Sequence, residues 1–400
     1  MIEFQESAIG LFLRLSENFI YEKSQCLSGY FQDKTIDWKC FKEAAVFHEL
    51  APFFYPEVKD DAVGIPPGIL EFLKRAHYYT FVRSQKKWRE FLTIAEAFGR
   101  KGLSLTPLKG LAGLADIYRE RPFRVMSDID ILIREEEIKA AKEVLAGLGY
   151  QSTLGGLKEK YWLERHCELT FYKEGGPPLD VHFRLDFKRP GREILPHLWE
   201  RVRTVSIEGR DLRLLSPEDQ LFSLALHERR YGGKMFCLKN VFDLALILKK
   251  CGERFDWDYV LREARAGKMR ATVFFIVLRA RIFFDAAVPE SVWTRLRISG
   301  AKKRAMTDLA NAQTFNPESE DQSKELFLKS HFLLFDGFWE PISYILNIPI
   351  EQFAKYYDLE PYANRTRWLY NLRFFYSPWR WIFGAKATGP KNPERRRSWR

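Results

Sequence analysis

The sequence predicts an α+β protein in which a small mixed β-sheet is flanked by N-terminal and C-terminal helical regions. Apolar residues recur at helical spacing before residue 100 and again after residue 216. Between these regions, short segments alternate apolar and polar residues and are separated by glycine and proline, which is typical of strands. With 400 residues, 46% of them hydrophobic, the chain can bury a core in two or three units.

We expect four segments along the chain. An N-terminal helical region covers residues 1–100, and the α+β core covers 101–215. A C-terminal helical region follows over 216–315, and a polar stretch at 316–324 reads as a linker. Residues 325–400 then form a helical, aromatic-rich segment with a basic tail.

The core begins with an apolar run, residues 103–108, that ends in Lys109 and Gly110 and precedes a helix over 111–118. A glycine at a strand-to-helix junction lets a phosphate approach the backbone closely, and the first turn of a helix offers free N–H groups to an anion. Lys109 at this junction is therefore a candidate phosphate ligand, with ordinary surface charge or a pair with Asp128 as the alternatives.

Two aspartates one residue apart, Asp128 and Asp130, lie in the segment 127–133 (Ser-Asp-Ile-Asp-Ile-Leu-Ile). Side chains alternate along a strand, so both carboxylates share one face while three isoleucines bury the other. Two like charges at this spacing should cost stability without a cation, and hard oxygen ligands suit Mg²⁺ bound together with substrate phosphates. A simply acidic, solvated strand is the alternative that the surrounding residues disfavour.

A third carboxylate is expected beside this pair. Strands over 167–173 and 179–184 are joined by a Gly-Gly-Pro turn and should pair as a hairpin, which makes Asp180 the candidate. His182 lies two residues later on the same face and is expected to contact substrate or orient a carboxylate. Arg124, four residues before Asp128, could grip phosphate oxygens with its guanidinium fork.

Taken together, these motifs resemble the uncharacterised nucleotidyltransferase family of the DNA polymerase beta-like superfamily. The resemblance covers about residues 36–290. The wider superfamily has Gly-Ser or Gly-Gly before its two aspartates, whereas this chain has Lys109-Gly110-Leu111 and a longer gap. The matching residues are Leu108-Lys109-Gly110, Tyr118, Arg124 to Ile133, Asp180 to Leu185, Leu215 to Asp219, His227 and Val241 to Ala245.

The resemblance implies transfer of a nucleoside monophosphate from an NTP such as ATP to an unidentified acceptor, with release of pyrophosphate. It implies Mg²⁺, or Mn²⁺ in its place, held by the catalytic residues Asp128, Asp130 and Asp180. The implied nucleotide-binding residues are Lys109, Gly110, Arg124, Ser127 and His182. Two alternatives stay open: a catalytically inactive nucleotide-binding or scaffolding protein of the same fold, and an RNA-binding protein acting through the basic C-terminus.

The helical region after Ser216 carries two further matching residues. Ser216 is expected to cap a helix whose first position is Pro217. His227 and Asp243 on later helices are expected either to line the cleft opposite the aspartates or to pair with each other and join two helices.

Other function classes find no support in the sequence. There is no Gly-x-Gly-x-x-Gly, no Walker lysine motif and no hydrolase nucleophile elbow. The five cysteines are scattered without metal-ligand spacing, and the N-terminus lacks the pattern of a signal peptide. We therefore expect a cytoplasmic protein in a reducing compartment.

The C-terminal segment 365–400 holds ten Lys or Arg residues against one acid, Glu394, and so carries most of the net charge of +11. Aromatic residues are interleaved with these arginines, an arrangement that suits a lipid headgroup boundary or stacked bases. We expect contact with an anionic membrane surface or RNA, and weigh it against a helix that packs its aromatics on the core and leaves a solvated tail.

Overall fold

The computed structural model describes eleven stretches and one single residue of the chain. It divides into two compact units, residues 1–321 with 333–336, and residues 322–332 with 337–400. The expected linker at 316–324 and the basic tail from 373 onward lie outside the described residues. Those that the structure describes are 8–23, 36–60, 64–118, 123–152, 159–187, 194–230, 236–315, 330–346, 350, 353–354, 359–360 and 363–372.

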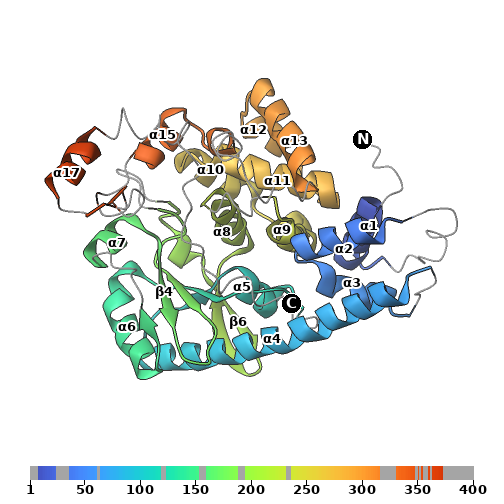
Figure 1. Ribbon diagram of the computed structural model, residues 1–400, viewed down its shortest axis with the longest axis horizontal. Coiled ribbons are helices and arrows are strands. Elements are labelled where there is room, and N and C mark those ends of the chain that lie inside the picture. Colours follow the sequence, from blue (N-terminus) through green and yellow to red (C-terminus); the bar gives the residue numbers. More distant parts are fainter. Residues whose placement is uncertain are drawn as a thin grey trace. The chain divides into compact units, whose positions relative to one another are not determined.

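The first unit begins with four helices, as the periodicity predicts. Asp37 caps the second of them, since its Oδ1 accepts hydrogen bonds from the backbone N–H groups of Lys39 and Cys40, each at 3.0 Å. The fourth helix, α4, is 34 residues long and passes along one side of the unit, with α3 at one end and α6 at the other (Figure 1). The helices are α1 (Ala8–Tyr21), α2 (Trp38–Phe47), α3 (Ala51–Val58) and α4 (Pro67–Arg100).

A five-stranded mixed sheet follows, with strand order β1-β2-β5-β4-β3. Strands β2 and β5 are parallel, and the other pairs are antiparallel. The expected hairpin of β4 and β5 is confirmed. The strands are β1 (Thr106–Pro107), β2 (Ile129–Leu132), β3 (Gln151–Ser152), β4 (Glu168–Tyr172) and β5 (Leu179–His182), and the helices between them are α5 (Lys109–Asp116), α6 (Ile138–Gly147) and α7 (Glu159–Arg165).

A separate two-stranded hairpin, β6 (Arg203–Ile207) and β7 (Arg210–Leu214), precedes the second helical region. Glu208 and Gly209 at its turn have φ of 52° and 73°, the left-handed backbone that a two-residue hairpin requires. Six α-helices follow among the described residues up to 315. They are α8 (Pro217–Arg230), α9 (Lys239–Cys251), α10 (Trp257–Ala266), α11 (Arg270–Phe284), α12 (Glu290–Arg295) and α13 (Gly300–Thr314).

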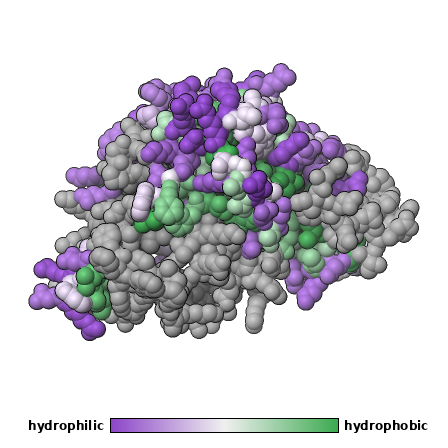
Figure 2. Space-filling model, turned by 90° about the horizontal axis from the view of Figure 1, so that it is seen from above, coloured by the Kyte–Doolittle hydropathy of each residue, from purple (hydrophilic) through white to green (hydrophobic). Residues whose placement is uncertain are grey.

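The second unit contains α15 (Trp339–Leu346) and α17 (Asn364–Asn371). The predicted α+β class, with a small mixed sheet between helical regions, is confirmed. In the space-filling view, hydrophilic side chains cover much of the described surface and smaller hydrophobic areas lie between them (Figure 2). Within the described part of the chain, no helix combines the length and the apolar character needed to cross a membrane.

Candidate active site

The parallel pairing of β2 and β5 brings the predicted carboxylates together. In the register of this pair Asp130 lies directly opposite Asp180, and Asp128 immediately precedes β2. The backbone of β2 is anchored because Ile129 and Ile131 are fully buried behind it. Burial, then the charges of Asp130 and Asp128, and then Glu168 raise the pKa of Asp180 to about 7. The three acids therefore form one electrostatic cluster.

Asp130 differs from the other two because Lys109 and His182 contact it. Its Oδ1 accepts from Lys109 Nζ at 2.5 Å and lies 3.0 Å from His182 Nε2. Burial alone would raise the pKa of the Asp130 carboxyl, but Lys109 and His182 outweigh burial and hold that pKa well below its usual range. Both contacts are made to Oδ1, so Oδ2 has no hydrogen bond to a residue that the structure describes.

The negative charge of Asp128 is only partly compensated by its neighbours. Burial and the charge of Asp130 raise its pKa, while Lys109 and a 2.8 Å hydrogen bond from Ser127 Oγ act in the opposite direction. The expected cost of crowded like charges thus falls on Asp128 and Asp180. At Asp130 the contacts from Lys109 and His182 offset that cost, since they hold its pKa low.

The junction between β1 and α5 aims Lys109 at the cluster. Lys109 itself has φ of 49°, a left-handed backbone that costs a non-glycine residue roughly 1–2 kcal/mol. Gly110 is required for a packing reason, since a Cβ there would lie 2.5 Å from Met126 Cγ. The lysine therefore pairs with Asp130, and not with Asp128 as one sequence alternative proposed.

Arg124 has a full set of protein partners. Its Nη2 lies 2.5 Å from Asp243 Oδ2 and 3.2 Å from Asn240 Oδ1, its Nε lies 3.1 Å from Asp243 Oδ2, and its Nη1 donates to Val125 O at 2.7 Å. Tyr118 donates to the same Asp243 carboxylate at 2.7 Å. Arg124 thus holds the segment before β2 against α9, and the expected phosphate contact would require this buried pair to open.

The contacts of Arg124 also determine the role of Asp243. From the sequence, Asp243 was expected either to face the aspartates or to pair with His227 and so join two helices. The structure instead pairs Asp243 with Arg124 and Tyr118. Sequence order gave no signal for this contact, because it joins residues 119 positions apart.

Glu168 and Lys87 lie near the site but were not among the site residues predicted from the sequence. Glu168 on β4 lies opposite His182 in the hairpin register, and its Oε2 is 3.1 Å from His182 Nδ1. The predicted hairpin already contained this pairing, so the strand register could have identified Glu168. Ligand atoms of Cys167, Glu168 and His182 lie within 4.8 Å of one another, and the last of these also contacts Asp130. Lys87 on α4 lies within electrostatic range of Asp128.

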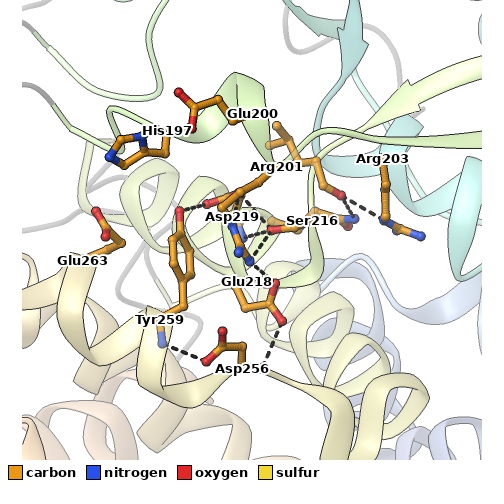
Figure 3. A network of polar contacts seen from close by, with 12 residues as sticks. His197, Glu200, Arg201, Arg203, Ser216, Glu218, Asp219, Asp256, Tyr259 and Glu263 are labelled. Atoms are coloured by element: carbon orange, nitrogen blue, oxygen red, sulfur yellow. Dashed lines mark hydrogen bonds and ion pairs between the residues drawn. The ribbon is translucent and has the colours of Figure 1, made fainter.

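The Ser216–Asp219 motif lies in a separate polar network (Figure 3). As predicted, Ser216 caps α8: its Oγ accepts from the backbone N–H of Asp219 at 3.2 Å and donates to the Asp219 carboxylate at 2.8 Å. Tyr259 on α10 donates to the same carboxylate at 2.7 Å. Arg201 packs 3.6 Å from the Tyr259 ring and pairs with Glu218 at 2.7 Å. The network joins α8, α10 and the segment before β6, so its acids act as scaffold.

Comparison with known proteins agrees with this geometry. A family model described as "Uncharacterised nucleotidyltransferase" matches residues 34–285, which include the whole aspartate cluster, Arg124 and Asp243. No curated protein matches the chain. Because the family model spans more than half of the sequence, the chain belongs to the uncharacterised nucleotidyltransferase family.

Proposed function

We propose that this protein is a metal-dependent nucleotidyltransferase that transfers a nucleoside monophosphate from an NTP to an acceptor. The observation that carries the proposal is the cluster formed by Asp128, just before β2, Asp130 on β2 and Asp180 on β5. Two of them, Asp128 and Asp180, have raised pKa values because burial and mutual repulsion are not fully compensated. A divalent cation would supply the missing positive charge.

By their chemistry the side chains of the cluster suit Mg²⁺ or Mn²⁺, and because their ligand atoms do not all lie within 4.8 Å of one another in this structure, a bound cation would draw them together. They offer hard carboxylate oxygens from Asp128 and Asp180, together with Asp130 Oδ2, which is uncommitted among the described residues. A bound cation supplies charge neutralisation for the substrate phosphates and activation of the attacking oxygen. His182 would keep Asp130 oriented through its 3.0 Å contact.

Lys109 would change partners on substrate binding. In this structure its ammonium group neutralises Asp130. When a cation takes over that role, Lys109 is available to bind a phosphate oxygen of the NTP. Gly110 and Ser127 lie beside Lys109 and Asp128 and complete the proposed nucleotide contacts.

The proposed reaction is an in-line displacement. An acceptor oxygen forms a bond to the α-phosphorus, and the bond from that phosphorus to the oxygen bridging to the β-phosphorus breaks. The electron pair of the broken bond leaves with pyrophosphate. Asp180, opposite Asp130 in the strand register, would either bind the cation or take the acceptor proton.

The test uses the full chain with each α-labelled NTP, Mg²⁺ or Mn²⁺, and sets of sugars, small metabolites, proteins and RNA as acceptors. We expect pyrophosphate release and a labelled acceptor with wild type, and neither with Asp128→Asn. Asp60→Asn is the matched control, because its side chain is 87% exposed. Equal turnover in Asp128→Asn and wild type would refute the proposal. Metal-dependent NTP binding without transfer to any acceptor would favour the inactive nucleotide-binding alternative.

We also propose that the basic C-terminus contacts an anionic membrane surface or RNA. The protein would then be cytoplasmic, with peripheral association at the membrane in the first case. This proposal rests on the charge of residues 365–400 and on Trp368 of α17, whose exposed fraction is 63%. Arginine and tryptophan side chains suit lipid headgroups as well as stacked bases.

A further inference from the structure

One stretch of α4, residues 84–90, lies against the end of the sheet where β2 and β5 begin. Ser84 Oγ donates to the carbonyl of Arg124 at 3.0 Å, just upstream of Asp128. Lys86 Nζ donates to the carbonyl of Gly175, in the turn that joins β4 to β5, at 3.1 Å. These contacts place the helix beside the acidic cluster.

Lys87 lies on the inner face of this stretch. Thr80, Ser84, Lys87 and Phe91 follow helical spacing and are all buried, and the exposed fraction of Lys87 is only 4%. Its ammonium group has no hydrogen bond or ion pair with any residue in the described stretches of the chain. Burial, followed by the charge of Arg83, lowers the pKa of Lys87 to about 8, while Asp128 acts in the opposite direction.

This arrangement sets Lys87 apart from the buried arginines of the unit. Arg124 is neutralised by Asp243 at 2.5 Å, and Arg279 by Glu228 at 2.8 Å. Among the described residues Lys87 has no such partner; its stem is buried, and its Nζ keeps some accessible surface. Lys87 thus has the features of a group that awaits an anionic ligand.

We propose that Lys87 binds the pyrophosphate part of the NTP together with Lys109. The proposal rests on the proposed function, and it follows from two positions. Lys109 contacts Asp130 from the start of α5, and Lys87 lies on α4 three residues after Ser84, which contacts the carbonyl of Arg124, and within electrostatic range of Asp128. Once a cation neutralises the carboxylates, the two ammonium groups remain to compensate the β- and γ-phosphates. The same pair would hold the pyrophosphate that the reaction releases.

The test compares Lys87→Met with Lys87→Arg, which keeps the charge, and with Lys86→Met. Lys86 is a matched control because it is the neighbouring lysine, lies exposed and contacts only a turn carbonyl. Isothermal titration of the full chain with ATP, inorganic pyrophosphate and AMP, each with Mg²⁺, measures the affinities. We expect Lys87→Met to weaken ATP and pyrophosphate binding at least tenfold and leave AMP binding unchanged. Lys87→Arg and Lys86→Met should stay within threefold of wild type.

Three results would overturn the inference. They are wild-type affinity of Lys87→Met for pyrophosphate, an equal loss of AMP affinity, and an equal effect of Lys86→Met. Lys87→Gln serves as a second uncharged variant, and thermal unfolding of each variant confirms that it is folded. Failure of the proposed function gives a different pattern: wild type then binds pyrophosphate in a Lys87-dependent way but transfers no nucleotide.

Discussion

Replacing Asp180 with asparagine removes the ionisation that the site tolerates least. The wild-type carboxyl is half-buried, and burial, followed by the charges of Asp130, Asp128 and Glu168, raises its pKa from 3.8 to about 7. In the unfolded chain these neighbours are gone and the pKa returns to its ordinary value. The amide of Asp180→Asn has nearly the same shape and cannot ionise. Comparing the two proteins therefore isolates one titration.

The sign and size of the effect follow from linkage. A carboxyl whose pKa is raised by folding contributes stability that is fully present below pH 3.8 and is lost as the pH rises through 7. Each pH unit within this window changes the free energy of unfolding by about 1.4 kcal/mol. From pH 5.5 to pH 8, wild type should therefore lose about 2 kcal/mol relative to Asp180→Asn.

Urea denaturation of the full chain at both pH values, with EDTA present, measures this difference. Asp211→Asn, on the exposed side of β7, is the control and should follow wild type. Addition of Mg²⁺ at pH 8 should stabilise wild type and have little effect on Asp180→Asn, since the cation replaces the proton. Parallel pH dependence of wild type and Asp180→Asn would refute the assignment of Asp180 to a crowded acidic cluster.

Three further changes test the site and the tail. Lys109→Met should weaken NTP binding about tenfold, about 1.4 kcal/mol, because a phosphate contact is lost. It should strengthen Mg²⁺ binding, because Asp130 loses its 2.5 Å partner. Titrations with Mg²⁺ alone and with MgATP separate the two effects, and unchanged affinity for both would contradict the assignment. Arg124→Met should lower the free energy of unfolding by about 3–5 kcal/mol, because Asp243 stays buried without its partner; normal stability with reduced turnover would instead support a phosphate contact. Removal of residues 390–400 should leave NTP binding unchanged and weaken association with anionic liposomes or structured RNA at low salt; equal binding by both proteins in both assays would identify the tail as solvated charge.

Local residue patterns in the sequence were enough to predict most of the secondary structure. The hairpin of β4 and β5 followed from alternating apolar residues around a glycine-proline turn, and the start of α8 followed from Ser216 before Pro217. The pair Asp128 and Asp130 was predictable as a unit, since alternation along a strand depends only on neighbouring residues. These features are local, and tertiary structure did not alter them.

Tertiary structure alone decided which of these elements meet. The parallel register that sets Asp180 opposite Asp130 joins strands that are separated by α6, β3, α7 and β4. The pairing of Arg124 with Asp243 and the approach of Lys87 to the acidic cluster also connect distant parts of the chain. No residue period encodes such contacts, because they depend on how whole helices and strands pack once their apolar faces are buried. The sequence thus identified the acids, and packing determined which cations face them.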